Sequence, residues 1–194
     1  MATVILRPSS TVSSGSFDNS ASGGSFGYGF INDSNNSTYV FNTSANQNFV
    51  VHMDDTSGLS GATFNNFVVT AIFQKHGARG ADGSFDVEIG DGSSATTFGS
   101  VSDTTFVTTN ATPTTISSSA IAFSGSVSDS DVDDMRISVT TTDNSQVRFF
   151  ELYVTVDYTA ATGYGHEVNN VAPANISKVL GIATASITKV NGVS

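Results

Sequence analysis

Cysteine and tryptophan are absent from the 194 residues of the sequence, and lysine and arginine together number only 7. Without cysteine the fold can hold neither disulfides nor thiolate metal sites, so its stability has to come from packing. The few basic residues and the formal net charge of −10 argue against nucleic-acid binding, because phosphate recognition requires clustered cations. These absences exclude a disulfide-stapled domain and predict that nucleic acid is not a partner.

Long apolar runs are absent as well. No stretch approaches the roughly 18–20 apolar residues of a membrane-spanning helix, and the first ten residues, MATVILRPSS, lack the charged and apolar regions of a secretory signal. We therefore expect no membrane partner and no signal-directed export. A surface rich in Ser, Thr, Asn and Gly, with little lysine, is nevertheless typical of proteins that end up outside a cell. Both properties together favour a virion component that is released by lysis.

Hydrophobic residues make up 38% of the chain and include 14 phenylalanines, which is enough for a sizeable core in one domain. The longest alternation of apolar and polar residues lies in Arg148–Tyr158, RFFELYVTVDY. This period predicts a β-strand with one face on the core, and we interpret it as the closing strand of the domain. The side chains predicted to point inward are Phe150, Leu152, Val154, Val156 and Tyr158, and those predicted to point outward are Phe149, Glu151, Tyr153, Thr155 and Asp157.

Shorter segments of the same kind precede the closing strand. Phe67–Phe73 is apolar on both faces and should lie inside a sheet, whereas Ser9–Gly24 and Asn32–Ser37 are polar, turn-forming stretches. With turn signals about every 8–12 residues and no convincing amphipathic helix, the pattern predicts an all-β sandwich or barrel. The other predicted strands are Thr3–Leu6, Ser25–Ile31, Thr38–Phe41, Asn48–Met53, Ser84–Ile89, Thr104–Thr109, Thr112–Ser118, Ala120–Phe123 and Met135–Thr141.

The acidic segment Asp129–Asp134, DSDVDD, is a candidate metal site. It places Asp129, Asp131 and Asp133 at alternate positions, as a calcium loop presents its oxygen ligands. The glycine and the distal glutamate of an EF-hand are missing, however. An acidic turn that prevents pairing at a sheet edge is therefore favoured over a calcium site, and we expect no cofactor.

A glycine-rich loop gathers three titratable residues, His76, Arg79 and Asp82. No recognisable motif places a serine or cysteine nucleophile beside them, so a polar loop is favoured over an active site. We expect a protein without enzymatic activity.

Phe149 and Tyr153, on the outward face of the closing strand, form an aromatic candidate site. Aromatic rings on a sheet can stack on sugar rings or can be buried against another surface. Because the chain has no tryptophan, burial against a second sheet or a neighbouring subunit is favoured over glycan contact.

Two long segments, FNNFVVTAIFQKHGARGADGSFDVEIGDGS and DVDDMRISVTTTDNSQVRFFELYVTVDY, flank a threonine-rich middle. They present an inner strand, a glycine-rich loop, a strand with an Asp-Gly turn and a closing strand that ends in V-x-V-x-Y. In this order, over about Phe64–Tyr158, they resemble a jelly-roll β-sandwich that recurs in bacteriophage virion proteins. The resemblance implies a structural role, as a capsid decoration, head fibre or tail fibre component.

After the closing strand the sequence becomes repetitive. Gly165–Ala172, Ile176–Ala183 and Ile187–Ser194 align at a period of 11 residues. This period also fits a right-handed helical coil, but β-branched residues with a glycine or asparagine in each unit favour short strands with tight turns. A disordered tail ranks lower, because such tails rarely carry so regular an Ile/Val pattern. Each unit is too small to bury its own apolar side, so it must pack on copies of itself or on a partner.

Similar short Val-Asn-Gly-Val repeats end other phage structural proteins, and this resemblance implies an assembly or attachment element. We therefore expect residues 1–163 to form a jelly-roll-like antiparallel β-sandwich and residues 164–194 a short β-rich repeat appendage. The appendage should produce a homo-oligomer, with a trimer favoured, or dock on other virion proteins. The alternative function is a carbohydrate-binding module or adhesin domain that recognises a host surface glycan. The predicted assembly residues are Val168, Val171, Ile176, Val179, Ile182, Ile187, Val190 and Val193.

Overall fold

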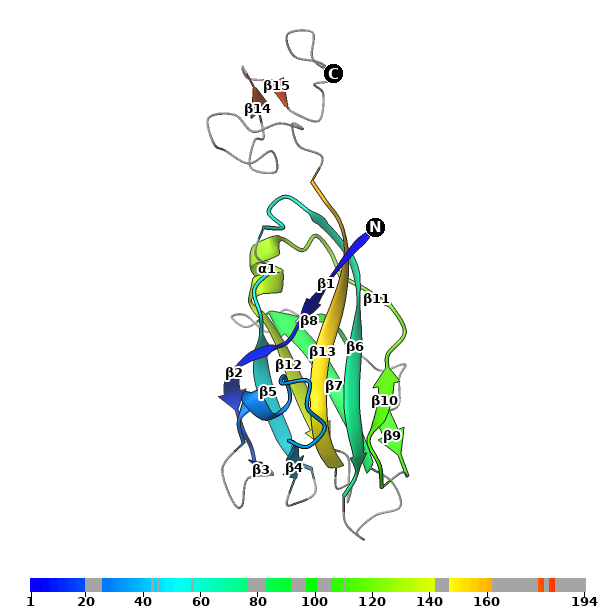
Figure 1. Ribbon diagram of the computed structural model, residues 1–194. Coiled ribbons are helices and arrows are strands. Elements are labelled where there is room, and N and C mark those ends of the chain that lie inside the picture. Colours follow the sequence, from blue (N-terminus) through cyan, green and yellow to red (C-terminus); the bar gives the residue numbers. More distant parts are fainter. Residues whose placement is uncertain are drawn as a thin grey trace.

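The computed structural model consists of two antiparallel β-sheets packed face to face, which confirms the predicted all-β sandwich (Figure 1). The described helices are one 3₁₀-helix, η1 (Tyr28–Phe30), and one short α-helix, α1 (Asp129–Asp133). No helix in this part of the chain is long and apolar enough to cross a membrane. The structure describes residues 1–19, 26–42, 44, 46–56, 58–76, 83–91, 97–100, 106–109, 111–141, 147–161, 178–179 and 182–183.

Within the described residues, seven strands form one sheet, here called sheet A, and six form the other, sheet B. The order in sheet A is β10 (Thr114–Ser117), β6 (Thr63–Lys75), β13 (Val147–Thr159), β4 (Val40–Asn42) and β3 (Phe17–Asn19), with β1 (Ala2–Leu6) also on β13 and β11 (Ile121–Ala122) also on β6. The order in sheet B is β2 (Pro8–Ser13), β5 (Asn48–Met53), β12 (Met135–Thr141), β7 (Gly83–Asp91) and β8 (Thr97–Ser100), with β9 (Phe106–Thr108) also on β7.

Eight of these strands pair as one long hairpin that has been rolled up. β4 pairs with β13, β5 with β12, β6 with β10, and β7 with β8. The first strand of the eight therefore pairs with the last, the second with the seventh, and so on inward. Successive pairs fall alternately in sheet A and sheet B. This is the topology of a jelly roll, which the resemblance of the sequence to virion jelly rolls implies.

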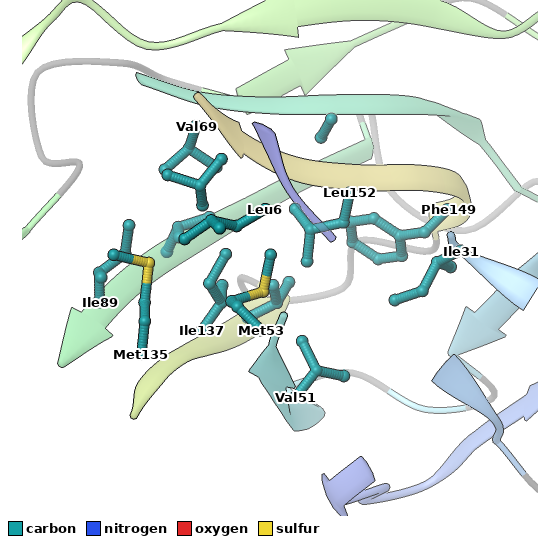
Figure 2. Close-up of a cluster of buried hydrophobic side chains, with 14 of the residues drawn as sticks. Leu6, Ile31, Val51, Met53, Val69, Ile89, Met135, Ile137, Phe149 and Leu152 are labelled. Atoms are coloured by element: carbon teal, nitrogen blue, oxygen red, sulfur yellow. The ribbon is translucent and has the colours of Figure 1, made fainter. Parts of the chain in front are cut away.

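Side chains from both sheets meet in a hydrophobic core between the layers (Figure 2). In Figure 2, Leu152 of sheet A and Met53 and Ile137 of sheet B point into the same space. All three are fully buried. The strand that contains Phe67–Phe73, β6, lies between β13 and β10, which confirms its predicted place inside a sheet.

Phenylalanine rings join the two sheets at one end of this core. The ring centre of Phe149, in sheet A, lies 4.7 Å from that of Phe85 and 5.4 Å from that of Phe49, both in sheet B. Phe73 lies 4.8 Å from Phe85 in the same edge-to-face arrangement. Such pairs contribute about 0.5–1.5 kcal/mol each beyond the burial of their area. Several of the phenylalanines in the sequence therefore link sheet A to sheet B.

A β-bulge interrupts the alternation of β13. Phe149 lies opposite Phe73 and Glu151 lies opposite Ile72, so Phe150 is an extra residue with no partner on β6. An extra residue exchanges the two faces of the strand on one side of it. Because of the bulge, Phe149 and Leu152 both point inward although they are three positions apart.

The bulge makes part of the predicted orientation of β13 wrong. Phe149, predicted to point outward, is fully buried on the inner face, whereas Glu151 points outward as predicted and is nevertheless only 2% exposed. Phe150 is buried outside the core cluster, with its ring centre 5.5 Å from that of Tyr39. Beyond the bulge the predicted inward residues Leu152, Val154 and Val156 are confirmed as fully buried, and Tyr158 is partly buried against the core.

Three other segments differ from the prediction. Within Ser25–Ile31, predicted as a strand, residues 28–30 form η1, and the backbone N–H of Ile31 donates to the carbonyl of Tyr28. Glycines that alternate with the aromatics weaken a strand and permit this turn. Ser9–Gly24, predicted as a loop, contributes to β2 and β3, because pairing with β5 and β4 outweighs weak local preference. The acidic DSDVDD segment is a helical turn, α1.

In the predicted appendage the structure describes β14 (Lys178–Val179) and β15 (Ile182–Ala183), which pair antiparallel with each other. Val179 lies opposite Ile182 in this pair, so two of the predicted assembly residues belong to a short strand pair. The other predicted assembly residues lie outside the described residues: Val168, Val171, Ile176, Ile187, Val190 and Val193.

We expect Leu152→Ala to lower the free energy of unfolding by about 2–5 kcal/mol, because it leaves a cavity between the sheets. Chemical denaturation measures this change. Thr155→Ala, on the outer face of the same strand, is the matched control and should cost less than about 1 kcal/mol, the span of strand propensity. An unchanged midpoint for Leu152→Ala would contradict the inward orientation of this side chain.

Candidate functional site

A depression of about 300 Å³ opens on the outer face of sheet A. Three parts of the chain form it: the N-terminal segment, the loop before β4, and the middle of β13 and β6. In Figure 1 the blue loop that precedes β4 crosses in front of β13. The residues that line the depression are Ile5, Arg7, Ser34, Asn36, Ile72, Glu151 and Tyr153.

Arg7 lies where the N-terminal segment passes from one sheet to the other. β1 pairs with β13 in sheet A, and β2 pairs with β5 in sheet B, so the chain crosses between them at this residue. The crossing is fastened on both sides. The carbonyl of Arg7 accepts a hydrogen bond from the N–H of Asp54 at 2.8 Å, and Nδ2 of Asn32 donates to the carbonyl of Pro8 at 2.7 Å. The backbone therefore holds the arginine side chain over β13.

Glu151 is the buried anchor of the depression. The bulge at Phe150 turns it to the outer face, where Nη1 of Arg7 donates to its Oε2 at 2.7 Å. The backbone N–H of Asn35 donates to Oε1 at 3.1 Å. A buried carboxylate is tolerated only when it is paired and hydrogen-bonded, and here both oxygens have a donor.

Tyr153 lies two residues further along β13, next to the same arginine. The guanidinium carbon of Arg7 is 5.3 Å from the centre of its ring, which is a cation–π contact. The tyrosine is half-buried, and its hydroxyl has no hydrogen-bond partner among the described residues. The hydroxyl of Tyr153 is therefore open to solvent or to a ligand.

The loop 32–37 forms the rim of the depression and is stabilised by its own side chains. The N–H of Asn35 donates to Oδ1 of Asp33, and the N–H of Ser37 donates to Oδ1 of Asn35, both at 2.9 Å. These bonds are typical of Asx turns. Ser34 has a φ of 57°, in the left-handed region that non-glycine residues rarely adopt. The side chains of Ser34 and Asn36 are exposed and make no hydrogen bond within the described residues.

The structure separates the two aromatic residues of the predicted site. Phe149 is fully buried against Phe49 and Phe85 of the second sheet, so it cannot contact a glycan. Burial against a second sheet is the interpretation that the sequence favours, although it occurs on the inner face of β13. Tyr153 remains the aromatic candidate on the outer face.

The three aspartates of the predicted metal site are not brought together. They lie in α1, where residues two apart point about 200° apart around the helix axis. Asp131 accepts from the N–H of Ser128 at 2.8 Å and closes a capping box, whereas Asp133 accepts from the N–H and hydroxyl of Thr56. Asp129 takes no part in either arrangement. Among the described residues no three acidic or histidine side chains are grouped as a metal site.

His76 lies at the end of β6, with its ring centre 5.1 Å from that of Phe41. Burial, and to a lesser extent the positive charge of Arg148, lower the pKa of His76 below its ordinary value of 6.5. The other two members of the predicted loop cluster, Arg79 and Asp82, lie outside the described residues.

The chain has no significant match to models of known protein families or to curated proteins. Its class is therefore defined by its own architecture, a jelly-roll β-sandwich with a polar depression on the outer face of one sheet.

We expect Arg7→Met to lower the free energy of unfolding by about 1–3 kcal/mol, because it removes the cation that faces the buried Glu151. Breaking a fully buried ion pair costs about 3–5 kcal/mol, and the 32% exposure of the Arg7 side chain reduces the effect. The double variant Arg7→Met/Glu151→Leu should lose less free energy of unfolding than the sum of the losses in the two single variants, since no charge then remains buried. Chemical denaturation of all four proteins tests this, and additive changes would contradict a direct coupling.

His76 should make the protein less stable in mild acid. Its pKa is lower in the folded than in the unfolded chain, so the unfolded chain binds the proton more readily. The free energy of unfolding should therefore fall as the pH decreases from 6.5 toward the folded-state pKa. Comparing thermal unfolding at about pH 7.5 and about pH 5.5 tests this, because His76→Gln should show a smaller decrease than the unmodified protein. Equal decreases in both proteins would exclude His76 as the source.

Proposed function

We propose that this chain is a non-enzymatic structural protein of a bacteriophage virion, a capsid decoration, head fibre or tail fibre component. The sandwich is the displayed body, and residues 164–194 assemble it with copies of itself or attach it to other virion proteins. The observation that carries the proposal is a division of the apolar residues: the described core of the sandwich is buried between its sheets, whereas the repeat units that follow it in the sequence are too short to bury their own Ile and Val.

The sandwich supports the first half of this division. The residues of its described core run from Leu6 to Val156, and the last strand of the sandwich, β13, ends at Thr159. Each sheet covers the apolar face of the other, which is the arrangement of a domain that is stable by itself.

The appendage supports the second half. Its units repeat Ile and Val at a period of 11 residues, and its described strands, β14 and β15, are two residues long and pair only with each other. A hairpin of this size is marginal in water unless something covers its apolar side. Copies of the same unit in other subunits provide that cover most simply, which favours a homo-oligomer, and among oligomers we favour a trimer.

Composition supports display outside a cell. The net charge of −10 and the small number of lysines and arginines keep such a body soluble and disfavour contact with packaged nucleic acid. The resemblance of Phe64–Tyr158 to phage virion jelly rolls agrees with this location.

Truncation after Ala161 should leave a folded, soluble sandwich that no longer assembles. This cut keeps β13 intact, together with Ala160 and Ala161, which line a small recess beside Leu59. Mass measurement in solution should show the full chain as an oligomer and the truncated chain as a monomer with cooperative thermal unfolding. Incorporation into purified particles, followed by immunoblotting, should be lost as well.

A second variant tests the appendage in a chain of full length. Val179→Asp/Ile182→Asp places two charges in the β14–β15 pair and should reproduce the loss of assembly without changing the unfolding of the sandwich. A truncated chain that still forms the oligomer and still enters the particle would refute the proposed role of the appendage.

A further inference from the structure

We propose that the depression formed by Arg7, Glu151 and Tyr153 is a binding site for a neutral sugar, one or two rings of a surface glycan. This inference concerns the sandwich alone, and it holds whether or not the appendage assembles the protein. It is argued from the size of the depression, its chemistry, its rigidity and its charge.

The size and the walls suit a sugar ring. The volume of about 300 Å³ is at the low end of the range of about 300–1,000 Å³ for small-molecule sites. Ile5 and Ile72 provide apolar walls, and Tyr153 adds an aromatic ring. A pyranose has an apolar face of C–H groups and a rim of hydroxyls. It can therefore place its C–H face on these side chains while its hydroxyls meet the polar rim.

The rim offers hydrogen-bonding groups that the described protein does not use. A guanidinium has five N–H donors, and Arg7 gives one hydrogen bond to Glu151. The side chains of Ser34 and Asn36 and the hydroxyl of Tyr153 have no partner among the described residues. Donors and acceptors that converge on one depression from several segments are what a polyhydroxylated ligand requires.

The site is held in position before any ligand arrives. The Arg7–Glu151 pair and the N–H of Asn35 fix the arginine and the loop at once, so little side-chain freedom is lost on binding. An apolar pair would fasten the crossing segment about as well, because buried ion pairs give little net stability. Fastening alone explains the buried carboxylate, and it does not use the side-chain polar groups of Ser34, Asn36 and Tyr153, which therefore stay available to a ligand.

The charge balance selects a neutral sugar over an acidic one. The cation of Arg7 is compensated by Glu151 at 2.7 Å, so no uncompensated positive charge faces the ligand. Asp33, in the same loop, adds a negative charge, and the chain as a whole carries −10. A sialylated or uronic-acid ligand would be repelled by this potential.

The test uses the full chain and the free sugars glucose, galactose, mannose and N-acetylglucosamine, with sialic acid as the acidic counterpart. Saturation-transfer NMR detects contact with the sugar, and amide chemical shifts should move in residues 34–36 and 151–153. We expect binding of at least one neutral sugar and none of sialic acid. Tyr153→Ala should weaken the binding about tenfold, the size expected of losing an aromatic face, and Asn36→Ala should weaken it by a smaller factor.

Asp86→Ala, at an exposed position of β7 in sheet B, is the control and should bind as the unmodified chain does. If Tyr153→Ala does not fold, as thermal unfolding would show, Tyr153→Phe and Asn36→Ala decide the question. Binding of sialic acid alone, binding unaffected by the variants at 153 and 36, or no contact with any neutral sugar would each overturn the proposal. The oligomeric state measured on the same samples separates loss of sugar binding from failure of assembly.

Discussion

The extra residue at Phe150 is the constraint on which both faces of sheet A depend. In an uninterrupted strand, residues three apart point to opposite sides, yet Phe149 and Leu152 are both fully buried in the core. The bulge resolves this conflict and leaves Glu151 on the outer face, where it must be paired because only 2% of it is exposed to water. Arg7 and the loop before β4 supply the pairing. A feature required by the core therefore determines where the polar site lies.

The same stretch explains why a depression forms there. One edge of β13 is covered by β1 over residues 154–158 and by β4 over residues 148–149. Between these short strands the N–H of Leu152 donates to the carbonyl of Ile31 at 3.0 Å, so the edge stays closed against pairing with another chain. Neither strand covers the side chains of Glu151 and Tyr153. The depression occupies this interval, with the crossing segment on one side and the loop 32–37 on the other.

Unbroken alternation predicts the strands well, because the period of two appears only where one face is buried. Asn48–Met53 and Met135–Thr141 are strands with the predicted bounds. The bulge escapes such an analysis, since the adjacent phenylalanines 149 and 150 satisfy either phase of the alternation. β2 has almost no apolar signal and depends on its partner β5. The helix α1 could have been found, because a serine three residues before an aspartate is the signature of a capping box.

The site is harder to predict than the fold, because its parts meet only after folding. Arg7 and Glu151 are 144 positions apart in the chain, and nothing local in either segment indicates the other. Glu151 and Tyr153 are the members whose outward position the alternation of a strand predicts. Among the lining residues, Arg7 and Glu151 are fixed by each other, whereas Ser34 and Asn36 have no described partner to lose. Changes at these two rim positions can therefore alter what binds without disturbing the frame, as expected of a loop carried on a rigid scaffold.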